Sequence, residues 1–330
     1  MSLFVVILNW NGKSDTLACL QSLQASEGVD FRVVVCDNGS TDGSLAALAA
    51  WGRLAFGSAC RQLGRGEVET SHPAAQERFF LIDNGANLGF AGGNNVGLRW
   101  ALRDPACRHA WLLNNDTEVA PDALAQALAR LGASSDLGLC GSTLVYAHDR
   151  QTVQAWGGSA YSRWSGRTRH LGAHSLLTHL PSDPAPVEAQ MACVVGAAML
   201  VRREWLESVG LLGEGYFLYF EEIDWAMRAA RVARAASAEG ATRPWRLAWA
   251  PRSIVFHKEG ASIGTAAGGG SALSAYYLFR NRVRFAWRFN RLRLPAVLAV
   301  TLLDVAKLAG RSRWPQARAA LRGTLQLART

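Results

Sequence analysis

The 330-residue chain is 49% hydrophobic and only 18% charged, with ordinary amounts of glycine (32) and proline (10). This composition excludes a long disordered protein and a collagen-like or linker-rich architecture, and the length allows one large domain with a small appendage. The 35 basic and 26 acidic side chains leave a formal net charge of +9, which favours anionic partners such as nucleotides, phosphates or anionic lipid without choosing among them.

Short apolar runs alternate with segments of helical spacing through the first half of the chain. The runs predict four strands, at residues 3–8, 31–36, 79–82 and 110–113. Their apolarity is continuous, which is typical of parallel strands covered on both faces. Leucines at helical spacing follow the first run and the fourth run. This order of strands and helices predicts a doubly wound α/β domain.

The remaining segments are less regular. Residues 52–78 show little periodicity and are expected to form a surface excursion, and residues 146–190 predict irregular hairpins or a flap. A buried strand is predicted at 193–201 and a helix at 221–238. Residues 264–270 resemble a flexible joint, after which the chain becomes aromatic, aliphatic and rich in arginine.

The six cysteines are scattered along the chain without a Cys-x-x-Cys pair, and several lie inside apolar runs. They are therefore expected to pack as small hydrophobic residues rather than to form a zinc site or a disulfide framework. The N-terminus enters an apolar run at Leu3 without a basic segment or a cleavage site. No secretory signal is predicted, and a reducing cytoplasm is the expected compartment.

Polar segments follow all four strands predicted in the first half of the chain. These segments are Asn9–Gly12, Asp37–Ser44, Asn87–Asn95 and Asn114–Thr117. One such segment alone is ordinary turn chemistry, because Asn, Asp and Gly are common in turns. Ligands of open α/β sheets bind beyond the carboxyl ends of the strands, so four polar strand ends together indicate a binding site.

The usual phosphate-binding loops are missing from the sequence. Neither Gly-x-Gly-x-x-Gly nor Gly-x-x-x-x-Gly-Lys-Ser/Thr follows a predicted strand. A nucleoside diphosphate would then need another counter-charge, and a divalent cation held by a carboxylate supplies one. Asp116 is the candidate ligand, and Asn114, Asn115 and Thr117 beside it offer further oxygen ligands or support through water.

Taken in order, these motifs and two later ones carry a family resemblance. The later motifs are Phe217–Trp225, which reads FLYFEEIDW, and Val255–His257. The chain resembles family 2 glycosyltransferases of the rhamnosyltransferase-like type, which build bacterial surface polysaccharides. The resemblance covers most of residues 3–285. It implies a GT-A fold, with a Rossmann-like, doubly wound, mixed and mostly parallel sheet and a C-terminal helical extension.

The resemblance also implies a binding site for the donor nucleotide. Asp37 would bind the ribose or base of a pyrimidine nucleotide. The other donor-binding residues that it implies are Asn9, Asn11, Asn87, Gly92, Asn94 and Asn115. The expected donor is a dTDP- or UDP-sugar.

A metal site for Mg²⁺ or Mn²⁺ is implied as well. Asp116 matches the last carboxylate of the family's Asp-x-Asp motif, whose first position is occupied here by Asn114, leaving one anionic ligand fewer. His257 matches a histidine that completes the metal site in some members. The alternative is a surface or packing histidine beside Lys258 and Glu259.

Inverting sugar transfer needs a general base for the acceptor hydroxyl. By its position in the matching motif, Glu222 is expected to be that base and Glu221 to orient the acceptor, although the roles can be exchanged. Asp224, Trp225 and Arg280 are further candidates for contact with the acceptor or the diphosphate. The alternatives are an acidic first helical turn, a surface pair of Asp224 with Arg228, and a tryptophan and an arginine used in packing.

The segment Leu294–Ala309 is aliphatic but shorter than the roughly 20 residues of a spanning helix. With arginines around it, an interfacial helix on anionic lipid is one interpretation. A helical hairpin packed on the catalytic domain or on a second copy in a homodimer is the other. The expected organisation is a nucleotide-sugar-binding half at residues 1–145, an acceptor-binding and catalytic half at 146–265, and a helical extension at 266–330.

The resulting hypothesis is a metal-dependent inverting glycosyltransferase of the cytoplasm or the inner face of the cytoplasmic membrane. It would transfer rhamnose or another hexose to a hydroxyl of a glycan or lipid-linked glycan. The alternatives are a non-catalytic glycan- or lipid-binding scaffold and a nucleotidyltransferase, although the latter lacks its basic triphosphate loop. Nucleic acid is not an expected partner, because no basic helix or aromatic-basic platform is present.

Overall fold

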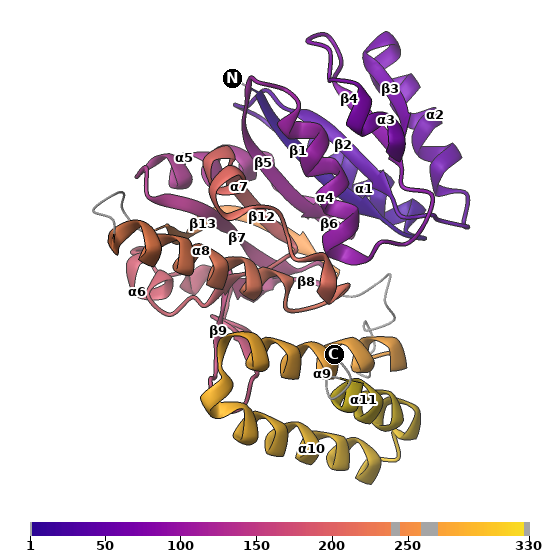
Figure 1. Cartoon of the computed structure of the whole chain (residues 1–330). Coiled ribbons are helices and arrows are strands. Elements are labelled where there is room, and N and C mark those ends of the chain that lie inside the picture. The colour runs from indigo at the N-terminus through magenta and orange to yellow at the C-terminus, as the bar shows by residue number, and fades with distance from the viewer. Residues whose placement is uncertain (1, 239–244, 259–269, 327–330) are drawn as a thin grey trace.

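The computed structural model describes residues 2–238, 245–258 and 270–326. A large twisted sheet with helices on both faces lies above a small sheet and three C-terminal helices (Figure 1). In spatial order the large sheet contains β3 (Cys60–Gly64), β4 (Phe79–Asp83), β2 (Arg32–Asp37), β1 (Ser2–Asn9), β5 (Cys107–Asn114), β12 (Ala198–Arg202), β7 (Leu137–Tyr146), β13 (Arg246–His257) and β6 (Thr117–Val119), while β8 (Asp149–Trp156) pairs with β7.

The sheet is mixed and mostly parallel. β3, β4, β2, β1 and β5 run parallel, and β12 runs antiparallel to both β5 and β7. The fold class and the four strands predicted in the first half are confirmed. The register places Asn9 beside Asp37 and Leu8 beside Asn114, so the polar strand ends meet at one edge.

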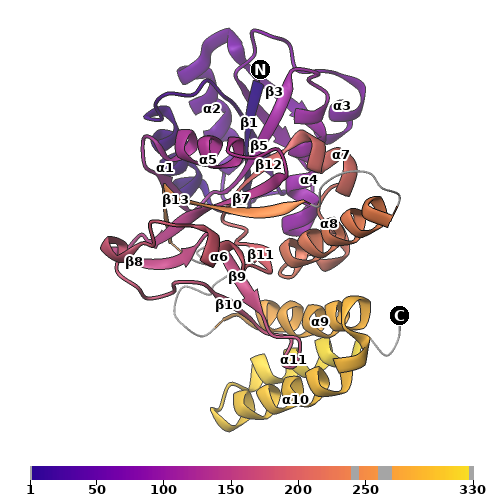
Figure 2. The same cartoon turned by 90° about the vertical axis from the view of Figure 1, so that its left-hand side faces the viewer.

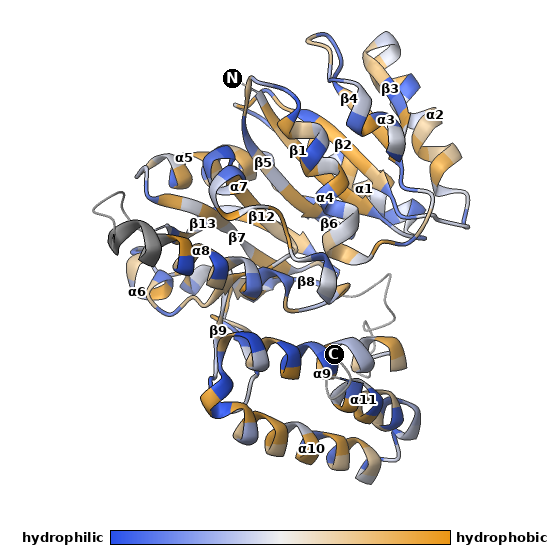
Figure 3. Cartoon of the chain, viewed as in Figure 1, coloured by the Kyte–Doolittle hydropathy of each residue, from blue (hydrophilic) through white to orange (hydrophobic). Residues whose placement is uncertain are grey.

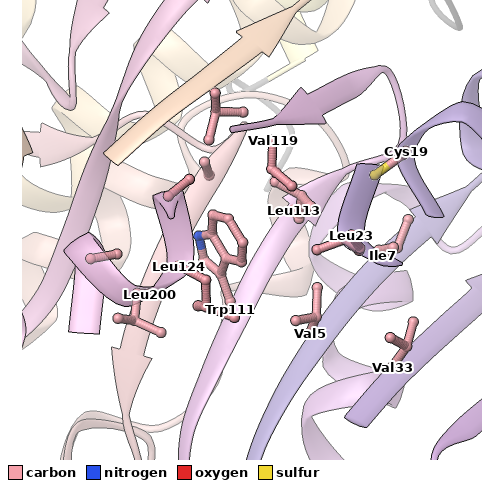
Figure 4. Packing of buried hydrophobic residues seen from close by; sticks show 14 of the residues in the cluster. Val5, Ile7, Cys19, Leu23, Val33, Trp111, Leu113, Val119, Leu124 and Leu200 are labelled. Atoms are coloured by element: carbon pink, nitrogen blue, oxygen red, sulfur yellow. The ribbon is translucent and has the colours of Figure 1, made fainter. Parts of the chain in front are cut away.

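Each face of the parallel strands is covered by helices, which explains the continuous apolar runs. Figure 4 shows one face, where Val5, Trp111 and Leu113 pack with Leu23 of α1 (Lys13–Gln24) and Leu124 of α5 (Ala123–Gly132). The same cluster includes residues of α2 (Ser44–Phe56). The opposite face of the sheet packs against α4 (Gly89–Leu102).

Residues 52–78 are not the surface excursion that the sequence predicts. They contain the end of α2, the edge strand β3 and the short helix α3 (Arg65–Thr70). Of the five residues of β3, only Leu63 is buried. An edge strand gains its order from hydrogen bonds to its neighbour β4 rather than from an apolar pattern of its own, so periodicity did not reveal it.

The single strand predicted at residues 193–201 is also wrong, because the structure divides it in two. β11 (Cys193–Val194) belongs to a small sheet with β9 (Gly158–Tyr161) and β10 (Thr168–His170), whereas β12 belongs to the large sheet. Residues 195–197 connect the two sheets. The predicted hairpins at 146–190 correspond to β8, β9, β10 and the short helix α6 (Ala185–Glu188).

The helix predicted at 221–238 and a helical C-terminal extension are both present in the structure. α7 (Arg203–Val209) precedes α8 (Glu221–Ala238), which has the predicted bounds. The C-terminal helices are α9 (Ala272–Phe289), α10 (Leu294–Gly310) and α11 (Trp314–Gln326), and they form a separate layer below the sheets (Figure 2). The predicted joint at 264–270 lies outside the described residues except for Gly270. Among the described helices, none combines the length and apolarity needed to cross a membrane.

Candidate active site

A cavity of about 590 Å³ opens beyond the carboxyl ends of β1, β2 and β5. The strand ends contribute Leu8, Asn38 and Asn114 to its lining, and the first turn of α8 contributes Glu221 and Glu222. The small sheet and the N-terminal part of α9 line the remaining sides. The cavity therefore lies where the large sheet, the small sheet and the C-terminal helices meet.

Asn9 and Asp37 form a buried pair at the strand ends and, unlike their neighbours Leu8 and Asn38, do not line the cavity themselves. Asn9 Nδ2 donates to Asp37 Oδ2 at 2.6 Å, and the backbone N–H of Ser40 donates to Asp37 Oδ1 at 2.9 Å. On the other side, Thr16 Oγ1 donates to Asn9 Oδ1 at 2.7 Å, and Asn115 Nδ2 donates to Thr16 Oγ1 at 3.0 Å. This chain of hydrogen bonds fixes three of the predicted donor-binding residues relative to one another.

Of the other predicted donor-binding residues, only one lines the cavity. Asn87 lines the cavity and accepts from the N–H of Gly89 at 2.9 Å. Asn11 is exposed outside the cavity lining, where its side chain accepts from the N–H of Thr41 at 2.7 Å. Gly92 and Asn94 are buried in α4 and do not line the cavity. Their positions support the packing of this helix rather than a direct contact.

Asp116 and His257 meet at the cavity wall. His257 Nε2 lies 3.2 Å from Asp116 Oδ1, and both side chains are nearly buried. His257 Nδ1 lies 2.8 Å from Gln154 Oε1, and an amide oxygen only accepts, so Nδ1 carries the proton. Nε2 then presents a lone pair toward a carboxylate. Two acceptors at this separation fit a cation or a proton between them.

Glu221 and Glu222 occupy the first turn of α8 and line the cavity. Glu221 is 2% exposed, and its Oε2 has no hydrogen-bond partner among the described residues. Burial and the neighbouring Glu222 raise its pKa well above the usual glutamate range. Burial also raises the pKa of Glu222, whose half-buried carboxylate accepts from the backbone N–H of Gly196.

Gly196 lies in the connection that divides the strand predicted at 193–201. A Cβ atom at this position would lie 2.3 Å from Glu222 Oε1, so a larger residue would displace the carboxylate. A glycine inside an apolar run is a signal for such a close approach, and the sequence prediction missed it.

The segment just before α8 has an unusual backbone. Phe217, Tyr219 and Phe220 have φ angles of +67°, +67° and +75°, which non-glycine residues rarely adopt. Asn281, fully buried in α9, lies with Nδ2 2.7 Å from the carbonyl oxygen of Leu218 and 3.1 Å from that of Tyr219. Strain of this kind persists only when the surroundings hold it, and it concentrates at functional sites.

Arg280, like Asn281, binds the backbone of the segment before α8, and it does not line the cavity. Its Nη2 donates to the carbonyl oxygen of Gly215 at 2.6 Å, and its guanidinium lies over the ring of Tyr277. Arg280 thus holds the segment that leads into α8, and its expected contact with the diphosphate stays a prediction.

Asp224 and Trp225 point away from the cavity, contrary to their proposed contact with substrate. Asp224 is fully buried and accepts from Tyr216, Arg228 and Arg288, so it is not part of a surface pair. Trp225 is also fully buried, and its Nε1 donates to the carbonyl oxygen of Gly210 at 2.7 Å. Both side chains lie one helical turn beyond Glu221 on the same side of α8, where neighbouring segments cover them.

Two parts of the lining were not predicted. The small sheet contributes Ser159, Thr168 and His170, and the Oγ of Ser159 lies 2.9 Å from Nδ1 of His170. The N-terminal part of α9 contributes Leu273 and Ser274. No motif marked these residues, because only the packing of the small sheet and α9 brings them to the cavity.

The sequence and fold together place the chain in a known class of proteins. The family model "Glycosyl transferase family 2" matches residues 4–210, and the chain belongs to this family. The predicted family is therefore confirmed.

A relative within this class is the "Low-salt glycan biosynthesis hexosyltransferase Agl10" of Haloferax volcanii. It is 25% identical over 150 residues, which cover 46% of this chain and 46% of that relative. The chain thus matches about half the length of this curated relative.

Solved structures share the fold. The mannosyltransferase PcManGT from Pyrobaculum calidifontis, solved in complex with GDP-Man and Mn²⁺, has a TM-score of 0.53 at 17% identity, covering 99% of this chain and 75% of that one. GalNAc-T7, solved with UDP, GalNAc and Mn²⁺, has a TM-score of 0.55 at 14% identity, covering 85% of this chain and 47% of that one. These likenesses confirm the GT-A fold class.

We expect Asn281→Leu to loosen the segment before α8. The substitution removes the amide from the carbonyl oxygens of Tyr216, Leu218 and Tyr219 and should lower the free energy of unfolding by about 1–3 kcal/mol, measured by urea denaturation. Gln21→Leu, which changes an exposed amide on α1, should alter it by less than about 0.5 kcal/mol. Equal effects of the two substitutions would contradict this role of Asn281.

Glu221→Gln should stabilise the protein at neutral pH. The raised pKa means that the folded state prefers the neutral side chain, so wild-type stability from this group is full below the unfolded value of 4.5 and falls as the pH rises toward the folded value. Urea denaturation should show equal stability of variant and wild type near pH 4 and a growing advantage of the variant toward pH 8. A constant difference across this range would contradict the burial of a titrating carboxyl.

Proposed function

We propose that the protein is an inverting glycosyltransferase that uses a nucleotide-sugar donor. One observation carries this proposal: two glutamates with raised pKa values and the Asp116–His257 pair line the same cavity at the carboxyl edge of a GT-A sheet. A sugar positioned between these groups would have a base on one side and a site for the leaving diphosphate on the other.

Glu222 is the proposed general base. It is the less buried of the two glutamates, and the N–H of Gly196 orients its carboxylate. The carboxylate would take the proton of the acceptor hydroxyl as that oxygen attacks the anomeric carbon on the face opposite the diphosphate. The C1–O bond to the diphosphate breaks as the new glycosidic bond forms, so no covalent enzyme intermediate is needed. Glu221 would orient the acceptor.

Asp116 and His257 are the residues proposed to hold a divalent cation, with Asn114 at the same strand end as a further oxygen ligand. An imidazole and a carboxylate suit Mn²⁺, and carboxylate and amide oxygens suit Mg²⁺. When bound, such a cation stabilises negative charge on the departing diphosphate. Gln154 would keep His257 in the tautomer that presents Nε2.

The proposed donor is a dTDP- or UDP-sugar carrying rhamnose or another hexose, held by Asp37 and the asparagines around it. The proposed acceptor is a hydroxyl of a glycan or lipid-linked glycan in the synthesis of a bacterial surface polysaccharide. Residues 1–145 would bind the donor, and residues 146–265 would supply the base and the acceptor site. The extension at 266–330 adds part of the cavity wall through α9.

Glu222→Gln should abolish sugar transfer while leaving donor affinity within about twofold, because it removes only the proton acceptor. Transfer is measured by chromatography of the product, and donor affinity by calorimetry. Glu204→Gln, an exposed substitution on α7, should retain wild-type turnover. Undiminished transfer by Glu222→Gln would eliminate this residue as the base, and the same test on Glu221→Gln would then decide between the two.

Thermal stabilisation by UDP-, dTDP- and GDP-sugars, each with and without Mn²⁺, tests the donor and the metal site together. A ligand that binds the folded state raises the melting temperature. We expect a Mn²⁺-dependent increase with one pyrimidine nucleotide-sugar, which Asp116→Asn should largely remove. Asp30→Asn, an exposed substitution at the opposite edge of the sheet, should retain it. The absence of any increase in the wild type would favour the non-catalytic scaffold.

A further inference from the structure

The positive charge of the protein is concentrated in its C-terminal part. Residues 271–330 contain 12 arginines and lysines and one acidic residue, a net charge of +11. Residues 1–270 contain 23 basic and 25 acidic residues, a net charge of −2. The excess that the composition shows therefore belongs to residues 271–330, whose described part forms the helical layer below the sheets.

Exposed apolar side chains are concentrated in the same layer. Eight of the eleven large apolar side chains exposed in the described residues lie between Leu273 and Leu325. Leu292 is 95% exposed and Leu303 is 61% exposed. Such clustering marks an interaction surface, whereas single exposed apolar residues are normal.

The helix α10 is mostly apolar, yet it is the outermost helix of this layer (Figures 1 and 3). Among its 17 residues only Val297 and Thr301 are buried. Its exposed residues recur every three or four positions and form one stripe along the helix, which we call the α10 stripe: Pro295, Ala299, Leu302, Leu303, Ala306, Lys307 and Gly310. A helix with this composition is normally covered on every side.

Basic side chains border the α10 stripe, and the acidic residue of this helix is paired with arginines. Exposed arginines stand at both ends, Arg291 before the helix and Arg311 after it. The one acidic residue, Asp304, is half-buried and bound by Arg282 at 2.8 Å and by Arg167. An apolar stripe with arginines at its ends is complementary to a surface whose anionic groups lie over an apolar interior.

We propose that the α10 stripe and the arginines beside it bind the surface of an anionic lipid bilayer. The apolar side chains enter the boundary between headgroups and acyl chains, and the arginines contact lipid phosphates. A second copy of the chain is the weaker candidate, because it would bring two layers of charge +11 together without acidic residues between them. α9 lies in the same layer and lines the cavity through Leu273 and Ser274, so docking would bring the proposed active site close to the bilayer.

Sedimentation of the full chain with lipid vesicles tests this proposal. We expect strong binding to vesicles of equal parts phosphatidylcholine and phosphatidylglycerol, at least tenfold weaker binding to pure phosphatidylcholine, and release by high salt. The double variant Leu303→Ser/Arg311→Gln should lose at least tenfold in binding. The matched control Leu54→Ser/Arg53→Gln, exposed at the end of α2, should bind like the wild type.

Three outcomes would overturn the proposal: no binding of the wild type, equal binding to both kinds of vesicle, or equal loss in the test and control variants. Light scattering tests the other occupant, a second copy of the chain. If the wild type is a dimer that does not bind vesicles, and the variant Leu303→Ser/Arg311→Gln is a monomer, the stripe is a dimer interface. The vesicle measurement needs no sugar nucleotide. Failure of membrane binding and failure of the proposed transferase activity are therefore recognised separately.

Discussion

The parallel register of β1 with β2 and β5 is the constraint on which the rest of the structure depends. It places Asn9 beside Asp37 and Leu8 beside Asn114, and the polar residues after each strand consequently share one edge. Helices cover both faces of these strands, so the edge is where polar groups remain available. The cavity, the Asp116–His257 pair and the first turn of α8 are all arranged around this edge.

The glutamates of α8 come from a different part of the chain and are held at a cost in stability. Burial of two neighbouring carboxyls disfavours their ionised forms, and the segment before them has three non-glycine residues with positive φ. Asn281 and Arg280 of α9 bind the carbonyl groups of this segment, and Asp224 joins α8 to α9 through Arg288. The C-terminal layer thus supports the first turn of α8 as well as carrying the proposed membrane surface.

Prediction from sequence succeeded where the pattern of apolar residues in a segment reflects how that segment is buried. The strands β1, β2, β4 and β5 are buried on both faces, and their apolar runs reflect this directly. It failed at β3, an edge strand that depends on pairing with β4. It also failed at residues 193–201, where the apolar run contains Gly196, a position without space for a side chain beside Glu222. Asp224 and Trp225 were misplaced because a motif does not state which segments cover each turn of a helix.

The sequence by itself determined the fold class, the family and the set of polar strand ends, since these follow from periodicity and from motifs in a fixed order. Only the tertiary structure decided which of those residues meet. It joined His257 to Asp116, brought Ser159 and α9 to the cavity, and placed Arg280 against the backbone of Gly215. It also revealed that a mostly apolar helix, α10, keeps one exposed stripe in the described part of the chain. Contacts between distant segments and the solvent exposure of a whole helix depend on how the elements pack, and no local pattern records that packing.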